Sequence, residues 1–440
     1  MFQAGTNPSP QMTMSAQQKE MLGNQLEAEL RRLLGIWFPR CVDREYGGFL
    51  CDFNYKWEPS GSQLKMIEYQ ARQTFAAAQS ALHLPESDAL CGAALHGFRY
   101  LQKVMWDAEY GGWYRLLDRA GSPGEGATKH GHGSSYAIRA CVACYELTGE
   151  EDALALAISA FQWLETHAHD ANYGGYFVFY QRDGTPILSE GGPLGVFRDP
   201  LGTPIGFKDA NTTSDLLKCF ADLYRVWPDA LLKSRLEELL NIVRDRFVVA
   251  PGLIHIHMHP DWTPLPDFVR YGQVLHSANH LISAASVLYA GVDPVTAKIA
   301  RSMVDHMLRV AWDPDKAGFS LAGSSFGLRH LDGAAIFVKD KRWWNQAEGM
   351  TALLAVAQMG PNQVPYIEYF VRLWNYVTTY VIDDRHGGWF ASGLDSNPEA
   401  RRWPKATMWR DAAHEVAALL ESKQILDTLP VGNETDTNVY

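Results

Sequence analysis

Two histidines in apolar helical stretches are the strongest candidates for chemistry in this sequence. His276 follows Gln273-Val-Leu, and His414 follows Trp409-Arg-Asp-Ala-Ala. Imidazole has a pKa near neutrality, so it can take a proton from a carbon beside a carbonyl group without special tuning. Two such groups on opposite faces of that carbon invert it, whereas one group that returns the proton to the neighbouring carbon exchanges an aldehyde for a ketone. We predict that His414 and His276 are the acid/base residues.

Guanidinium and indole groups stand near the starts of other helical stretches. Arg72 follows Gln70-Ala, and Trp344 and Trp409 lie in polar-aromatic segments. A guanidinium can hold the oxygen of an enediolate, and an indole face can stack on the apolar side of a sugar ring. These residue types favour a carbohydrate as the substrate.

Composition removes several classes of function. The formal net charge is −11, so a nucleic acid or an anionic membrane surface would be repelled. Apolar runs are too short for a bilayer span, and residues 1–14 lack the pattern of a secretion signal. The six cysteines are few for 440 residues. We expect a cytoplasmic protein without nucleic-acid or membrane partners.

An internal repeat organises the chain. A motif recurs that consists of an aspartate, three further residues, Gly-Gly and an aromatic residue, and a weaker copy ends in Ala-Gly-Phe. The glycine before the aromatic residue falls at positions 48, 112, 175, 318 and 388. The interval between positions 175 and 318 is twice the others, and Pro251-Gly252-Leu253 lies near its middle. The sequence therefore predicts six units, each with a helix, a tight glycine turn, a polar loop and a second helix.

The two helices of a unit differ in character. Those before the turns are amphipathic and charged, and we expect them at 15–38, 88–105, 151–168, 229–247, 294–311 and 364–381. Those after the loops are enclosed, and we expect them at 70–84, 133–148, 211–226, 271–290, 343–359 and 408–425. The stretch 271–290 contains no charged residue apart from its histidines, so it must be covered on nearly every side. This alternation predicts an all-α protein, an (α/α)6 barrel of six helical hairpins. One catalytic domain would span 15–426, between disordered tails at 1–14 and 427–440.

The starts of the inner helices should form the mouth of the barrel. Cations, amides and aromatic residues gather there, among them Lys129, Lys208, Lys341 and Lys405. We expect these side chains to converge around one funnel, where helix amino termini add positive potential.

The residues at these starts resemble the N-acylglucosamine 2-epimerase superfamily, which includes cellobiose 2-epimerases and mannose or sulfoquinovose aldose–ketose isomerases. Three segments within about 20–425 carry the resemblance: Gln70-Ala-Arg72, Lys341-Arg-Trp-Trp-Asn-Gln-Ala-Glu348 and Trp409 to His414. The resemblance implies epimerisation or isomerisation at the carbon beside the aldehyde of a sugar, with Arg72 and Trp344 as sugar contacts, Glu348 as a polar site residue and His414 as one catalytic base.

The sequence departs from the superfamily at two positions. Gln273 stands where the family usually has its other acid/base histidine, with His276 in place of a following glutamate, and Thr213 stands where the family has a histidine after Asn211. Glutamine cannot shuttle a proton. His276 lies on the same helical face one turn deeper, from where it can take over the transfer.

We therefore expect a sugar 2-epimerase or aldose–ketose isomerase that needs no metal or other cofactor. Its sugar would be bound by Arg72, Asn211, Gln273, Trp344, Glu348 and Trp409, and a homodimer is possible. Two alternatives stay open: a glycoside hydrolase or lyase that uses Asp209, Asp215, Glu348 or Asp411, and a sugar-binding relative without activity.

Overall fold

A computed structural model describes residues 14–189, 197–266, 268–324, 337–360 and 363–430, so the tails expected at 1–14 and 427–440 lie largely outside the described residues. The described residues contain twelve α-helices: α1 (Ala16–Cys41), α2 (Ile67–His83), α3 (Asp88–Tyr100), α4 (Gly131–Thr148), α5 (Glu151–His167), α6 (Ala210–Val226), α7 (Ala230–Ile242), α8 (Tyr271–Tyr289), α9 (Pro294–Val310), α10 (Trp343–Gln358), α11 (Val364–Tyr376) and α12 (Ala413–Thr428). Single π-helical turns continue α3, α7 and α11 as η1 (Leu101–Met105), η2 (Val243–Phe247) and η3 (Val377–Val381), and η4 (Pro398–Arg402) is a 3₁₀ turn. The prediction of a helical protein is confirmed.

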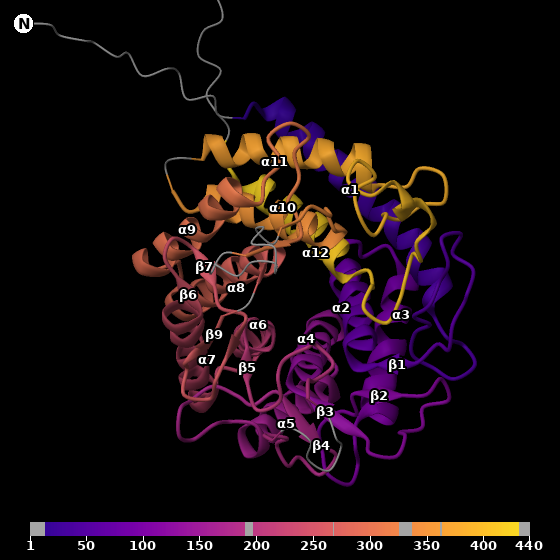
Figure 1. Cartoon of the computed structure of the whole chain (residues 1–440). Helices are drawn as coiled ribbons and strands as arrows, with labels where there is room; N and C mark the ends of the chain where they lie inside the picture. The colour runs from indigo at the N-terminus through magenta and orange to yellow at the C-terminus, as the bar shows by residue number, and fades with distance from the viewer. Residues whose placement is uncertain (1–13, 190–196, 267, 325–336, 361–362, 431–440) are drawn as a thin grey trace, which may run out of the picture.

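The even-numbered helices form a closed ring. In order, α2 packs on α4, α4 on α6, α6 on α8, α8 on α10, α10 on α12, and α12 returns to α2. The odd-numbered helices lie outside this ring, and each packs against an inner helix. Figure 1 shows this arrangement in a view down the axis of the ring. The sequence patterns explain the two positions: α7 buries Leu232, Leu236, Leu239 and Leu240 on one face, whereas α8 is buried over most of its circumference.

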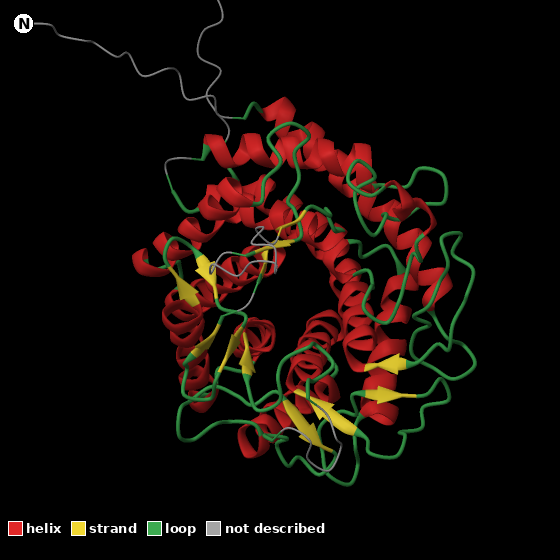
Figure 2. Ribbon diagram, viewed as in Figure 1, coloured by secondary structure: helices red, strands yellow, loops and turns green. Residues whose placement is uncertain are grey.

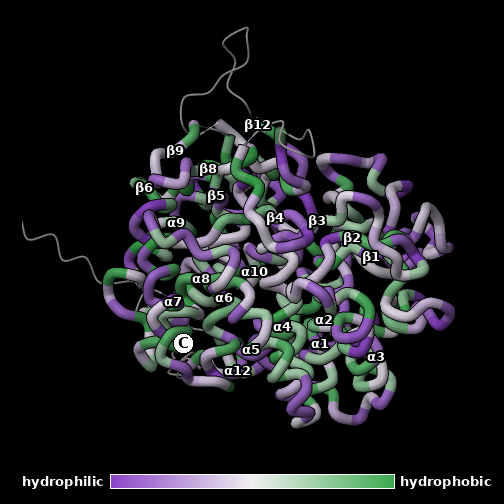
Figure 3. The backbone as a smooth tube through the Cα atoms, turned by 90° about the horizontal axis from the view of Figure 1, so that it is seen from below, coloured by the Kyte–Doolittle hydropathy of each residue, from purple (hydrophilic) through white to green (hydrophobic). Residues whose placement is uncertain are grey.

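The strands are short (Figure 2), and they lie toward one end of the ring (Figure 3). They are β1 (Lys65–Met66), β2 (Leu116–Leu117), β3 (Thr128–His130), β4 (Phe179–Gln181), β5 (Lys208–Asp209), β6 (Val248–Val249), β7 (Leu253–Ile254), β8 (His257–Met258), β9 (Pro264–Leu265), β10 (Val269–Arg270), β11 (Ala322–Gly323) and β12 (Phe337–Val338). All pair in antiparallel register, for example Lys129 of β3 opposite Tyr180 of β4. The pairs β1–β2, β3–β4, β5–β8 and β10–β11 connect neighbouring units, whereas β6–β7, β8–β9 and β11–β12 each lie within one unit.

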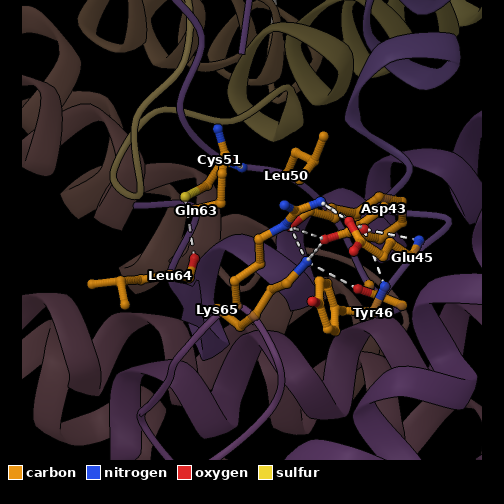
Figure 4. Close-up of polar contacts among 12 residues, drawn as sticks. Asp43, Glu45, Tyr46, Leu50, Cys51, Gln63, Leu64 and Lys65 are labelled. Atoms are coloured by element: carbon orange, nitrogen blue, oxygen red, sulfur yellow. Dashed lines mark hydrogen bonds and ion pairs between the residues drawn. The ribbon is translucent and has the colours of Figure 1, made fainter. Parts of the chain in front are cut away.

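A buried ion pair recurs under the glycine turns. Lys65 Nζ lies 2.8 Å from Asp43 Oδ2, and both groups are almost fully buried (Figure 4). The same pair forms in four further units: Lys129 with Asp107, Lys208 with Asp170, Lys341 with Asp313 and Lys405 with Asp383. The expectation that Lys129, Lys208, Lys341 and Lys405 line the funnel is therefore wrong, because each is held by the aspartate and a carbonyl oxygen of its own turn.

The fourth unit lacks both partners of this ion pair. Its turn runs through Pro251-Gly252, and Val269, fully buried, stands in β10 where the other units have lysine. Loss of the aspartate is thus matched by loss of the lysine, since a buried ammonium without a counter-ion would be costly.

The last inner helix begins later than the sequence pattern predicts. The expected start was residue 408, but α12 begins at Ala413, after a turn in which Thr407 pairs with Arg410. Asp411 Oδ1 accepts a hydrogen bond from the Ala413 N–H at 2.9 Å, which satisfies one free donor of the first turn. Trp409 therefore lies on the loop above the helix. No helix in the described part of the chain is long and apolar enough to cross a bilayer.

Candidate active site

Each inner helix contributes one side chain to a polar layer across the ring. Five of them stand seven residues after the lysine, or Val269, that precedes the helix. Because each of them lies at the same offset from an equivalent position of the repeat, these residues share one face and one depth of their helices. With His414 from α12, the polar layer consists of Arg72, Tyr136, Asp215, His276, Glu348 and His414.

The polar layer is held together by contacts between neighbouring helices. Glu348 Oε1 lies 2.8 Å from His414 Nδ1, and Glu348 Oε2 lies 3.0 Å from His276 Nδ1. On the other side of His276, Nε2 is hydrogen-bonded to Asp215 Oδ1 at 2.8 Å. The Tyr136 hydroxyl donates to the same oxygen at 3.2 Å. One imidazole is thus enclosed between two carboxylates.

A second buried histidine extends this network towards the mouth. His132 stands in the first turn of α4, with Nε2 at 3.1 Å from Asp215 Oδ2 and Nδ1 at 3.2 Å from Glu68 Oε1. Imidazoles and carboxylates therefore alternate from His414 through Glu348, His276, Asp215 and His132 to Glu68.

The network fixes the charges of its members. Burial opposes the charged form of His276, but Glu348 and Asp215 outweigh it and raise the pKa of His276 to about 10. Burial is likewise outweighed at His132, whose pKa Asp215 and Glu68 raise to about 9. The same pairings outweigh burial in the carboxylates and hold the pKa values of Glu348 and Asp215 well below their usual range. Near pH 7 both histidines are cations and both acids are anions.

His414 differs from the other two histidines. Its Nδ1 faces the ionised Glu348, which places the ring hydrogen on that nitrogen, and its side chain is 18% exposed. Within the described residues, its Nε2 has no hydrogen-bond partner. A carboxylate that fixes the tautomer of an imidazole in this way leaves the other nitrogen as a base.

His280 supports His276 from below. Its Nδ1 lies 2.8 Å from the carbonyl oxygen of Ser214, and its ring centre is 3.9 Å from that of His276. Burial, reinforced by the charge of His276, holds the pKa of His280 well below its usual value. Asp215, His276 and His280 have ligand atoms within 4.8 Å of one another, the spacing of a metal site. Their nitrogens already contact Asp215 and Ser214, so this donor set fits a proton network better than an ion.

A cavity of about 360 Å³ opens above the polar layer and brings most of the predicted site residues together. Its lining includes seven of the eight: Arg72, Asn211, Gln273, His276, Trp344, Trp409 and His414. The eighth, Glu348, lines a deeper cavity on the other side of the layer. Thr213, noted as a departure from the family, is instead buried and donates to the carbonyl oxygen of Asp209.

The cavity also contains residues beyond the eight predicted ones. Tyr136, Trp343, Arg270 and His132 line it, and Pro200 and Leu201 reach it from a loop. That loop is fixed by Asp199, whose Oδ2 lies 2.8 Å from His130 Nε2, and both side chains are buried. The spacing from the repeated lysines is a signal that finds Tyr136, whereas Pro200 and Leu201 reach the cavity through the contact between Asp199 and His130, which no local pattern shows.

The four carboxylates considered for glycoside hydrolysis are all engaged. Asp215 and Glu348 are paired with imidazoles, and Asp411 lies 3.5 Å from Arg72. Asp209 caps α6 by accepting from Thr212 N and Oγ1. A glycosidase needs one carboxyl group that is protonated and in contact with the substrate, and this arrangement provides none from these four.

Comparison with known proteins identifies the family of this chain. Residues 47–176 and 206–410 match the family described as N-acylglucosamine 2-epimerase. The cellobiose 2-epimerase of Bacteroides fragilis is 25% identical over 419 residues, covering 91% of this chain and 98% of that protein. The D-mannose isomerase of Marinomonas mediterranea is 22% identical and covers 92% and 97%.

A solved structure shows the same fold. The cellobiose 2-epimerase from Spirochaeta thermophila superimposes with a TM-score of 0.82 at 23% identity, over 94% of this chain and 98% of that one. The family match spans well over half of the sequence, and the chain therefore belongs to the N-acylglucosamine 2-epimerase family.

Proposed function

We propose that this chain is an aldose–ketose isomerase for a sugar with a free aldehyde end. Its helices would form an (α/α)6 barrel, with the sugar in the cavity of about 360 Å³ above the polar layer, which is called the mouth cavity below. The observation that carries the proposal is the difference between the histidines of the polar layer. Among the described residues, His414 presents an unpaired Nε2, whereas both nitrogens of His276 lie within 3.0 Å of a carboxylate oxygen.

The proposed reaction uses one base. His414 Nε2 takes the proton from C2 of the open-chain aldose, and the electron pair of the broken C–H bond forms the enediolate. The hydroxyl proton of C2 passes to the aldehyde oxygen, and His414 returns its proton to C1, which gives the ketose. Every atom is conserved, and no cofactor takes part in these steps.

The surrounding charges favour the anionic intermediate. Arg72 lies over the Tyr136 ring at 4.0 Å and lines the mouth cavity together with the charged His132 and His276. Fixed cations beside a forming oxyanion lower its energy without reorganisation during the reaction. Trp344, with its ring centre 6.1 Å from that of His414, and Trp409 offer faces for the sugar ring.

A sugar 2-epimerase is the second candidate, favoured by the relatives named cellobiose 2-epimerase. In that reaction His414 would remove the C2 proton and the His276 imidazolium would supply one from the other face. His276 would then act as an acid, since its raised pKa makes it a poor base near pH 7.

One labelling experiment separates these reactions. Glucose, mannose, N-acetylmannosamine and cellobiose are incubated with the protein in D2O and followed by NMR. The isomerase gives a ketose with deuterium at C1, and the epimerase gives the C2 epimer with deuterium at C2. Conversion of no sugar, or release of a monosaccharide from cellobiose, would refute both.

The role of His414 is tested by His414→Ala, with His386→Ala in a surface turn as the control. We expect His414→Ala to lower kcat by about 10²–10⁴ because a general base contributes that much, while the control keeps the wild-type rate. Full turnover by His414→Ala would remove the assignment.

A further inference from the structure

Two further cavities lie on the side of the polar layer opposite to the mouth cavity. The first, of about 310 Å³, is lined at one end by members of the polar layer, Arg72, His276, Glu348 and His414. The next, of about 410 Å³, shares six lining residues with the first: Phe75, Arg139, Lys218, Ala417, Glu421 and Gln424. The two cavities therefore adjoin each other, with these six side chains as their common boundary, and are together called the axial passage below.

This axial passage reaches solvent at the end opposite to the mouth. His83 and Arg225, at the carboxyl ends of α2 and α6, are exposed and line or approach the second cavity, as does exposed Gln424 of α12. The lining residues follow the polar layer at helical spacing: Arg139 is three residues after Tyr136, and Lys218 three after Asp215. The passage is thus built from the next turns of the same inner helices.

The side chains along the passage are charged. Arg139 Nε lies 2.9 Å from Asp222 Oδ2, and Lys218 also pairs with Asp222. Glu421 makes no hydrogen bond or ion pair within the described residues, and burial raises its pKa. Charged groups around a space of several hundred Å³ are stable when water fills the space, since an unhydrated charge there would be costly.

We infer that the axial passage is a water path through which the imidazole–carboxylate network exchanges protons with solvent while a sugar closes the mouth, with Glu421 as a carrier. The inference rests on the proposed proton transfer at His414. A proton taken from the sugar resides on the His414 imidazolium, which borders the first cavity, and can there be replaced by a proton from water. The exchange involves no oxidation or net change of charge.

The test follows a label out of the substrate. An aldose with deuterium at C2 is converted in H2O under single-turnover conditions, and the deuterium retained in the product is measured by mass spectrometry. We expect the wild type to lose most of the label. Ala417→Leu places a larger side chain where the two cavities join, and if this slows exchange tenfold, a retained fraction of about one tenth rises to about one half.

Two further variants make the result specific. Ala89→Leu adds the same bulk in a groove between α1 and α3 that shares no lining residue with the passage, and should retain as little label as the wild type. Glu421→Gln keeps the shape of the path but removes the carrier, and should also raise retention. Equal retention in the wild type, Ala417→Leu and Glu421→Gln would overturn the inference, as would complete retention in the wild type.

A measurement without turnover keeps the inference separate from the proposed function. In protein labelled with ¹⁵N-histidine, the exchange of the imidazole N–H protons with water is measured by NMR with sorbitol at saturating concentration. We expect slower exchange in Ala417→Leu than in Ala89→Leu. Identical rates would refute the passage even if no sugar were converted, and slower exchange without any conversion would refute only the isomerase proposal.

Discussion

Replacing Glu348 by glutamine tests the charge arrangement of the polar layer directly. The carboxylate of Glu348 contacts both His414 and His276, at 2.8 and 3.0 Å. Glutamine has nearly the same shape, but its amide oxygen can accept from only one of the two rings, and its NH2 group faces the other. We expect that the ring hydrogen of His414 is no longer held on Nδ1 and that His276 loses its proton near pH 7.

The magnitude follows from the pKa of His276. Raising it from 6.5 to about 10 is linked to at most about 5 kcal/mol of stability. Glu348 and Asp215 share this effect, so roughly half of it, about 2–3 kcal/mol, should depend on Glu348. Because the folded pKa is the higher one, this stability is fully present below about pH 6.5 and is lost as the pH rises towards 10.

The assay combines unfolding with kinetics. Melting temperatures of the wild type and Glu348→Gln are compared at pH 6, 8 and 10, and we expect the difference to be large at pH 6 and to shrink towards pH 10. In parallel, kcat should fall by about 10²–10⁴. Glu237→Gln, on the exposed face of α7, is the matched control and should change neither quantity. A pH-independent loss of stability together with normal turnover would refute the proposed charges.

Three further changes test other parts of the molecule. Gln273→His places an imidazole at the position where the family usually has one, and we expect the yield of C2 epimer relative to ketose to rise; an unchanged product ratio would show that this position does not decide the outcome. Burial raises the pKa of Glu415 to about 8, so the folded protein binds more protons at this group than the unfolded chain between pH 4.5 and 8, and stability falls as the pH rises through that range. The melting temperature of Glu415→Gln should therefore rise relative to that of the wild type from pH 5 to 8. A difference that stays constant over this range would contradict the reasoning. Lys65→Val leaves Asp43 without its buried ammonium partner and should cost about 3–5 kcal/mol, whereas adding Asp43→Asn should restore part of the melting temperature; a double variant no more stable than the single one would argue against the ion pair.

The recurring turns made the helical arrangement predictable from the sequence. A glycine such as Gly48, with φ of 62°, adopts a conformation that other residues rarely take. The glycine therefore recurs in the turn of each unit, where it is visible in the sequence. Helical periodicity then gave the outer and inner helices to within a few residues. The exception was α12, which begins only at Ala413, after a turn between Thr407 and Arg410 that the apolar pattern alone does not show.

The sequence by itself determined which helical residues share the depth of the site, and the tertiary structure brought the loop residues to it and decided what each side chain does there. Residue type and helical spacing place Arg72, His276 and Glu348 at one depth, because equivalent positions of a repeat face the same axis. Whether His276 is a base or a cation depends on which carboxylates approach its two nitrogens, and these come from α6 and α10, 61 and 72 residues away along the chain. A pKa is set by burial and by charges in space, and only the closed ring of helices brings those charges together.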